Sequence, residues 1–167
     1  MARTALGELT LERILFMPTG SPRYRQPAVA SGEDRIAKLR IATEGESRYE
    51  IDARELGAGA TGYTVDTLRE LRLELGAATE LWLLMGADQY SKLNSWHRPQ
   101  DVRKLSRIAV FARPGSKISD AGARVVPFEP MSISASEIRD RVSRGEDIGG
   151  LVPPPVANYI ADHKLYR

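Results

Sequence analysis

The segment Leu81–Met85 constrains the fold of this 167-residue chain more than any other, because its five residues are all apolar. A strand without polar residues is typical of a central position in a parallel sheet that is covered on both faces. Segments with helical periodicity alternate with short apolar strands along the chain. The sequence therefore predicts an α/β fold of Rossmann-like type, a mostly parallel sheet with helices on both faces. At this length one core suffices, and we expect a single domain over residues 1–167.

Turn and capping residues set the predicted bounds of the other elements. Ser31 with Asp34 three residues on has the form of a helix start, and Pro99 suits the first turn of a helix. In chain order we expect a helix within 2–11, a strand at 13–17, a helix from Ser31 and a half-exposed strand at 49–53 near a sheet edge. A helix capped by Thr64 comes next, closed by Gly76 and with Val65, Leu68, Leu71 and Leu75 inward. Strands at 108–111 and 124–128 follow, and a last helix begins after Pro153-Pro-Pro155 and ends near Tyr166.

A serine-rich segment, Ser-Ile-Ser-Ala-Ser-Glu-Ile-Arg at 132–139, leads into a predicted helix. Ser134 followed three residues later by Glu137 is the pattern of a capping box, which marks a helix N-terminus. The unpaired N–H groups and the positive dipole there suit an anion, and the hydroxyl of Ser136 and the guanidinium of Arg139 add donors. The segment is either a phosphate site or a capped surface helix with a solvated arginine.

The composition argues against several classes of function. A net charge of +2 and a sequence pI of about 9.0 are too mild to indicate nucleic-acid binding. The chain has no cysteine and two histidines, so we assign no metal ligand. No apolar run approaches the length of a membrane span, and Glu8 and Glu12 interrupt anything like a signal peptide. We therefore expect a cytoplasmic protein that binds neither nucleic acid nor a membrane.

One motif points to a different class of protein. Residues Gly57–Gly62 match the glycine pattern of a dinucleotide-binding turn and precede a helix. The strand before them alternates polar and apolar residues, whereas a first Rossmann strand is apolar throughout. We interpret the motif as a flexible loop, and a dinucleotide-dependent oxidoreductase is the weakest of three functional hypotheses.

Several short motifs follow one another along the chain. They are Phe16-Met-Pro-Thr-Gly-Ser-Pro22, Tyr63-Thr-Val-Asp-Thr-Leu68, Gly86-Ala-Asp88, Ser95-Trp-His97, Arg113-Pro-Gly115, Ile133–Arg139 and Leu165-Tyr-Arg167. Together, and over essentially the whole chain, they resemble the bacterial nicotinate-nucleotide adenylyltransferases. The resemblance implies a nucleotidyltransferase of NAD biosynthesis. Such an enzyme transfers AMP from ATP to nicotinate mononucleotide, with Mg²⁺ assisting, and gives deamido-NAD and pyrophosphate.

The resemblance also implies roles for individual residues, and it leaves the oligomeric state open. Trp96 is either the aromatic that stacks on the pyridine ring or a core anchor, and Asp88 either meets the adenosine ribose or caps the next helix. The resemblance assigns Tyr63, Thr64 and Trp96 to the pyridine nucleotide. It assigns Gly86, Asp88, Ser134, Ser136 and Arg139 to ATP, with Arg139 also as the catalytic residue. Arg23 or Arg25 corresponds more loosely to a loop in which the family keeps basic residues.

The sequence departs from the pattern of this family at the start of the chain. Family members open with a strand and then Gly-Gly-Thr-Phe-Asp-Pro and His-x-Gly-His motifs, which bind the ATP phosphates. The present sequence begins within the segment that corresponds to the first helix, so the resemblance implies that the first, central strand is missing. Two hypotheses follow. One is an adenylyltransferase represented by an inactive truncation, and the other is a non-catalytic nucleotide-binding paralogue that keeps the pyridine-nucleotide pocket.

We expect the 167-residue chain by itself to show no adenylyltransferase activity, because losing even one preorganised donor typically costs ~10²–10³ in rate. We also expect the strands at 13–17 and 81–85, which flank the absent strand in the family, either to stay unpaired with each other or to pair directly. A turnover assay of the purified chain with ATP, magnesium and nicotinate mononucleotide tests the first expectation. Robust product formation would contradict it.

Overall fold

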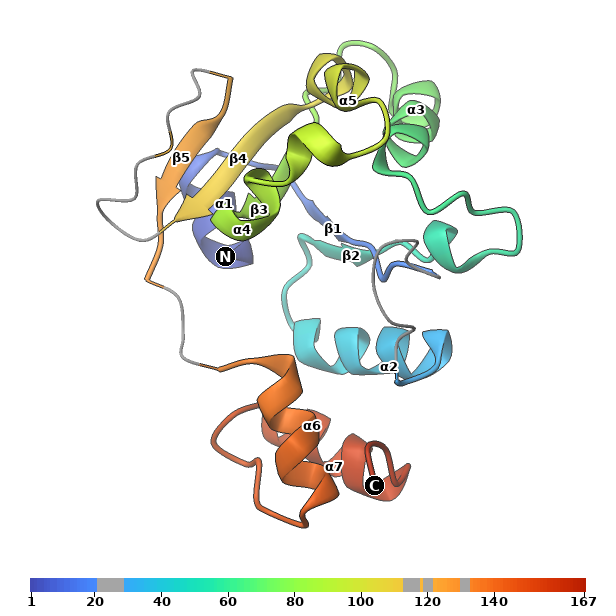
Figure 1. Cartoon of the computed structure of the whole chain (residues 1–167), viewed down its shortest axis with the longest axis vertical. Coiled ribbons are helices and arrows are strands. Elements are labelled where there is room, and N and C mark those ends of the chain that lie inside the picture. The colour runs from blue at the N-terminus through green and yellow to red at the C-terminus, as the bar shows by residue number, and fades with distance from the viewer. Residues whose placement is uncertain (21–28, 113–117, 119–121, 130–132) are drawn as a thin grey trace. The chain divides into compact units, whose positions relative to one another are not determined.

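The computed structural model describes residues 1–20, 29–112, 118, 122–129 and 133–167 (Figure 1). The contacts divide the chain into two compact units. Unit 1 consists of Met1–Glu12 and Ala60–Pro130, and unit 2 consists of Arg13–Gly59 and Met131–Arg167. Each unit is described by itself below, and the expectation of a single domain stays a prediction.

Unit 1 is built on a sheet of three parallel strands in the order β3, β4, β5 (Figure 1). The register places Gly86, the last residue of β3, opposite Phe111 of β4. The elements of unit 1 are α1 (Ala2–Glu8), α3 (Thr64–Leu75), β3 (Trp82–Gly86), α4 (Ala87–Tyr90), the 3₁₀ turn η2 (Leu93–Ser95), α5 (Pro99–Leu105), β4 (Arg107–Ala112) and β5 (Arg124–Pro127).

The core of unit 1 lies between the sheet and the two helices α3 and α5, which pack on each other. Its members share near-complete burial, and they are Val65, Leu68, Met85, Leu93, Val102, Ile108 and Val110. Hydrogen bonds join the last turn of α3 to the end of α5. The guanidinium of Arg72 donates two hydrogen bonds to the carbonyl oxygen of Leu105, at 3.0 and 2.8 Å. These bonds satisfy a carbonyl that the end of α5 leaves without a helical partner.

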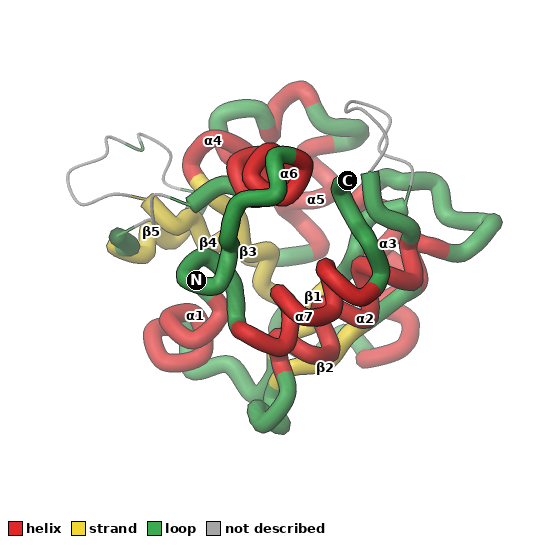
Figure 2. Tube along the Cα trace, turned by 90° about the horizontal axis from the view of Figure 1, so that it is seen from below, coloured by secondary structure: helices red, strands yellow, loops and turns green. Residues whose placement is uncertain are grey.

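Unit 2 combines a two-stranded parallel sheet with three helices. Its elements are β1 (Ile14–Phe16), α2 (Gly32–Thr43), β2 (Tyr49–Ile51), the 3₁₀ turn η1 (Arg54–Leu56), α6 (Ala135–Ser143) and α7 (Pro154–Asp162). Helix α2 lies against α7, with the hydroxyl of Tyr159 donating to a carboxylate oxygen of Asp34 at 3.0 Å (Figure 2). A small core of Ile148, Val156 and Ile160 lies in the C-terminal part of this unit.

Most of the predicted elements are confirmed. The fold is α/β with parallel strands, the Ser31 side chain caps α2 by accepting from the Asp34 N–H at 3.0 Å, and Pro99 opens α5. The strands expected at 13–17 and 81–85 fall in different units, β1 in unit 2 and β3 in unit 1, so their mutual arrangement stays a prediction. No helix in the described part of the chain has the length and apolar character needed to cross a membrane.

Four details of the prediction are wrong. The central strand of its sheet is β4, whose residues 108–112 are buried, whereas β3 lies at one end of the strand order. Thr64 is the first residue of α3 and Tyr63 is its N-cap, and Leu75 is 39% exposed because it faces away from the core at the helix end. The last helix ends at Asp162, well before Tyr166.

Helix α7 ends there because the chain turns into a left-handed conformation. Lys164, with φ of 52°, donates its N–H to the Ala161 carbonyl at 3.1 Å, and Leu165 donates to the Ile160 carbonyl at 3.0 Å. This pair of bonds defines a Schellman motif, in which glycine is the usual left-handed residue. Helix α6 ends in the same motif with Gly145, at φ of 72°.

We therefore expect Lys164→Gly to stabilise the protein by roughly 0.5–1 kcal/mol. A left-handed backbone costs an L-residue about 1–2 kcal/mol, and the greater freedom of glycine in the unfolded chain offsets part of that gain. The matched reverse change, Gly145→Lys, should destabilise it by a similar amount. Thermal unfolding of both variants checks this, and a melting temperature that falls in Lys164→Gly would show that the turn is not strained.

Candidate functional site

The start of α3 presents unpaired backbone donors. Tyr63, the N-cap residue, is extended, with φ of −103° and ψ of 123°, and its carbonyl accepts from the N–H groups of Asp66 and Thr67 at 3.0 and 3.4 Å. Among the described residues, no acceptor takes the N–H groups of Thr64 and Val65. These two N–H groups lie at the positive end of the macrodipole of a 12-residue helix, so this point suits an anion.

Tyr63 and His97 lie together at that helix start, and Trp96 packs against the core of the same unit. The rings of Tyr63 and His97 lie 4.2 Å apart between centroids at an interplanar angle of 30°. Tyr63 and Trp96 both pack against the buried cluster that contains Val65 and Met85. Trp96 is half-buried, so it has the contacts of a core anchor and still keeps exposed surface for a ligand.

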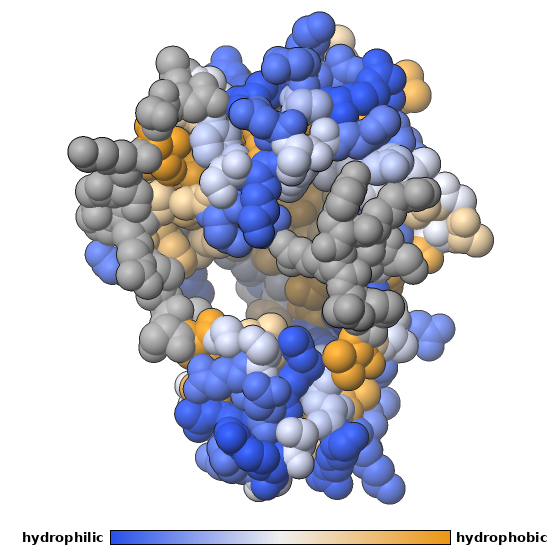
Figure 3. All heavy atoms as spheres, in the orientation of Figure 1, coloured by the Kyte–Doolittle hydropathy of each residue, from blue (hydrophilic) through white to orange (hydrophobic). Residues whose placement is uncertain are grey.

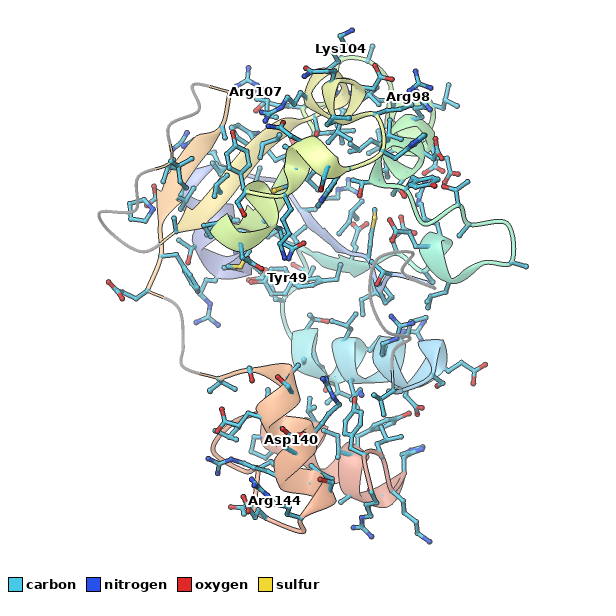
Figure 4. The ribbon with its side chains drawn as sticks, in the orientation of Figure 1. Tyr49, Arg98, Lys104, Arg107, Asp140 and Arg144 are labelled. Carbon is cyan, nitrogen blue, oxygen red and sulfur yellow. The ribbon has the colours of Figure 1, made fainter. Side chains whose placement is uncertain are left out.

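A chain of polar contacts joins the starts of α3 and α5. The Thr61 hydroxyl donates to Asp66 at 2.8 Å, Arg69 bridges Asp66 and Asp101 at 2.9 and 3.3 Å, and Arg98 pairs with Asp101 at 2.5 Å. In Figure 4, Arg98 and Lys104 mark the two ends of α5. Sequence reasoning missed this network, although Asp66 and Arg69 have the three-residue spacing of a helical ion pair. The network links the start of α3, which carries Tyr63, to the start of α5, which follows His97.

The turn after β3 brings the carboxylate of Asp88 back over Gly86. A Cβ atom on Gly86 would lie 2.8 Å from one Asp88 carboxylate oxygen, so a larger residue there would require the Asp88 side chain to shift. The side chain of Gln89 donates to the other oxygen at 2.9 Å, and this hydrogen bond lowers the pKa of Asp88 below its usual value. An exposed, ionised carboxylate at the carboxyl end of a parallel strand is placed to accept hydrogen bonds from a ligand hydroxyl.

The start of α6 in unit 2 is a second group of donors. The Ser134 hydroxyl oxygen accepts from the Glu137 N–H at 3.1 Å and lies 3.1 Å from the Ser136 hydroxyl. The capping box is completed on one side only, because the Glu137 carboxylate accepts from Arg141 at 3.0 Å instead of turning back to the helix start. The N-terminus predicted from the sequence is confirmed, with the serine hydroxyls already hydrogen-bonded to each other or to the backbone.

Arg139 lies on the same helix and is half-buried. It makes no hydrogen bond or ion pair with any residue that the structure describes, in contrast to Arg141 and Arg144, which pair with Glu137 and Glu146. The visible surface over α6 is mostly hydrophilic (Figure 3), and Arg144 lies at the end of the helix (Figure 4).

The predicted site residues fall into both units. Tyr63, Thr64, Gly86, Asp88 and Trp96 belong to unit 1, and Ser134, Ser136 and Arg139 belong to unit 2. In unit 1, Tyr63 and Trp96 pack against one buried cluster, and Gly86 and Asp88 lie in the turn after β3. In unit 2, Ser134 and Ser136 lie at the start of α6, and Arg139 lies further along the same helix. Arg23, Arg25 and the Arg113–Gly115 motif lie outside the described residues.

The glycine motif at 57–62 does not form a dinucleotide-binding turn. In such a turn the glycines follow a strand directly, whereas here the 3₁₀ turn η1 separates β2 from Gly57. The structure thus removes the geometric basis of the oxidoreductase hypothesis.

Two surface hollows lie elsewhere. One of about 320 Å³ is in unit 1 at the amino ends of β3 and β4, where Arg72, Glu80 and Arg107 line it. Another of about 600 Å³ is in unit 2 beside α6 and α7, with Val142 and Asn158 on its walls. Neither hollow includes a predicted site residue. In addition, no three histidine or acidic side chains of the described residues form a group that could hold a metal ion.

The sequence matches known proteins along its whole length. Residues 1–141 match the family described as Cytidylyltransferase-like, which defines the chain as a nucleotidyltransferase of that class. All of the chain aligns, at 37% identity, with a protein of Laribacter hongkongensis, of which it covers 86%, and at 34% identity with one of Chromobacterium violaceum, of which it covers 90%. Both are named "Probable nicotinate-nucleotide adenylyltransferase". The chain belongs to the nicotinate-nucleotide adenylyltransferase family.

Solved structures agree with this at the level of the fold. The chain superimposes with a TM-score of 0.72 on a structure described as "Plasmodium falciparum nicotinic acid mononucleotide adenylyltransferase complexed with NaAD". The match covers 93% of this chain and 83% of the other at 17% identity. The expected family, enzyme class and Rossmann-like fold are thus confirmed.

The place of Arg139 on α6 leads to a prediction. Arg139→Lys should weaken ATP binding several-fold, because lysine offers a point charge where arginine can donate two hydrogen bonds to one phosphate. Arg139→Ala should weaken it further, and Arg144→Lys, at the other end of α6, serves as the matched control. Calorimetric titration of each variant with ATP measures the effect. Parent-like affinity in both Arg139 variants would show that this helix start does not bind the triphosphate.

Proposed function

We propose that this chain binds ATP and nicotinate mononucleotide, the substrates of an adenylyl transfer that gives deamido-NAD and pyrophosphate. One observation carries the proposal. In unit 1, the half-buried Trp96 packs against the same buried cluster as Tyr63 and Val65 at the start of α3, and the strand that ends at Gly86 contributes Met85 to that cluster. The relatives named as adenylyltransferases and the Plasmodium falciparum structure with NaAD support the same reaction.

The start of α3 is the proposed receptor for the nicotinate carboxylate. The N–H groups of Thr64 and Val65 lack protein acceptors within the described residues, and the Thr64 hydroxyl is adjacent. The interaction of a charge with a helix terminus contributes about 0.3–1 kcal/mol when exposed and up to about 2 kcal/mol when partly buried. Because nicotinamide carries no such charge, this contact would favour the acid over the amide nucleotide. The indole of Trp96 is the proposed surface on which the pyridine ring stacks.

The start of α6 is the proposed receptor for the triphosphate, and Asp88 the acceptor for ribose hydroxyls. In the reaction, an oxygen of the mononucleotide phosphate forms a bond to the α-phosphorus of ATP. The bond from that phosphorus to the oxygen bridging to the β-phosphate breaks, and pyrophosphate leaves. Catalysis is then positioning and stabilisation of charge on phosphate oxygens, a role that suits Arg139.

Magnesium would bind together with the triphosphate of ATP. Mg²⁺ is commonly held by substrate phosphates and one or two carboxylates, so a dedicated protein site is not required. A cytoplasmic location stays a prediction.

The two tryptophans allow a selective test of the pyridine site. Trp82 donates its indole N–H to Glu80 at the amino end of β3, whereas Trp96 follows η2. In a Trp82→Phe variant all tryptophan emission comes from Trp96, and nicotinate mononucleotide should quench it on binding. Stacking on a desolvated aromatic is worth on the order of 1–3 kcal/mol, so Trp96→Ala should weaken nicotinate mononucleotide binding at least several-fold and leave ATP affinity unchanged.

The control is the single variant Trp82→Phe, which should bind both nucleotides as the parent does. Equal loss of both affinities in Trp96→Ala would show that Trp96 acts only as a core residue. Quenching by nicotinamide mononucleotide at the same concentrations would contradict the role given to the start of α3.

A further inference from the structure

The closing motif Leu165-Tyr-Arg167 has no part in the proposed site, yet its backbone is unusual. Both Lys164 and Tyr166 have left-handed conformations, with φ of 52° and 66°. Such conformations are strained for residues other than glycine and persist where surrounding contacts over-determine them. The contacts of this segment therefore indicate what holds it in place.

Three kinds of contact hold the end of the chain within unit 2. Lys38 of α2 donates a hydrogen bond to the Tyr166 hydroxyl, and its ammonium lies 4.6 Å from the centre of the same ring. The N–H of Leu165 donates to the Ile160 carbonyl at 3.0 Å. The side chains of Leu165 and Tyr166 pack against the small core. Tyr166 thus joins α2 to the core beside α7.

Helix α6 depends on the same small core. None of its residues is fully buried, and Ile138 and Val142 are the α6 side chains that pack against the cluster of Ile148, Val156 and Ile160. That cluster consists of three buried side chains with exposures of 7%, 7% and 4%. A core this small loses much of its packing when one neighbouring aromatic ring is removed. Ile138 lies four residues after Ser134, so looser packing of the cluster would increase the mobility of the first turn of α6.

We propose that the closing motif positions the start of α6, and that Tyr166 is the positioning residue. The inference deepens the proposed function, on which it rests for the statement that this helix start receives the triphosphate. Tyr166 touches no substrate in this account. It acts through the cluster it shares with Ile138.

Hydrogen exchange tests the inference without reference to any ligand. Tyr166→Ala should speed exchange of the amides in α6 several-fold and leave those of β3, β4 and β5 at parent rates. Tyr166→Phe keeps the ring and should have a smaller effect. Tyr49→Ala is the matched control, because Tyr49 is a tyrosine of the same unit that packs on Phe16, with centroids 5.2 Å apart. Parent rates throughout α6 in Tyr166→Ala would overturn the inference.

A double-mutant cycle tests the contact itself. Lys38→Met removes the charge and keeps most of the aliphatic chain. If the lysine acts through the tyrosine hydroxyl, its effect on α6 exchange should be smaller in the Tyr166→Phe background than in the parent. Fully additive effects of the two changes would contradict a direct interaction between Lys38 and the Tyr166 hydroxyl.

Ligand titrations then separate this inference from the proposed function. Tyr166→Ala should weaken ATP binding several-fold and leave nicotinate mononucleotide binding unchanged, since the latter is assigned to unit 1. Faster exchange in α6 with parent-like ATP affinity would support the positioning of α6 and contradict its assignment to the triphosphate. Unchanged exchange would overturn the positioning role whatever the ATP affinity.

Discussion

Strand β4 is the element on which the candidate site in unit 1 depends. Its residues from Ile108 to Ala112 are buried, and it pairs in parallel with β3 on one side and β5 on the other. Pairing in register places Gly86 opposite Phe111, so the chain leaves β3 at the carboxyl edge of the sheet. Ligands of open α/β folds bind at that edge. A polar substitution inside β4 would therefore disturb both the core and the turn that carries Asp88.

The proposed nucleotide contacts rely on backbone N–H groups at two helix starts, one in each unit, more than on ionisable side chains. At α3 the donors are the amides of Thr64 and Val65, and at α6 they follow the Ser134 cap. A helix start offers a preorganised positive end without burying a charged side chain, which would carry a large desolvation cost. Phosphates and a pyridine carboxylate are the chemical groups such starts favour. Arg139 and Asp88 add a bidentate donor and an acceptor to this backbone framework.

Local signals in the sequence predicted the elements well, and signals that depend on distant residues did not. The caps at Ser31 and Ser134 and the helix start at Pro99 were predictable because each involves residues within one helical turn. The apolar run at 81–85 indicated a parallel strand, but the order of strands in the sheet is set by long-range pairing. Residues 108–112 of β4 form an apolar run of the same length, so apolar character alone did not distinguish the central strand.

Around the candidate site, too, local features were predictable from the sequence and long-range contacts were not. The residue types of Tyr63, Thr64 and Trp96 were identified from short motifs, but the stacking of Tyr63 on His97 joins segments far apart in the chain. The left-handed turn at Lys164 had no sequence signal either, because lysine is not the residue that marks such turns.

The central claim is that the pyridine nucleotide binds at the start of α3 and the triphosphate at the start of α6. Amide chemical-shift mapping of the isotope-labelled chain tests both parts in one experiment. Nicotinate mononucleotide should shift the amides of Thr64 and Val65 and the indole N–H of Trp96, and ATP should shift the amides from Ala135 to Arg139. Shifts at α6 with nicotinate mononucleotide alone, and none at Thr64 or Trp96, would contradict the account.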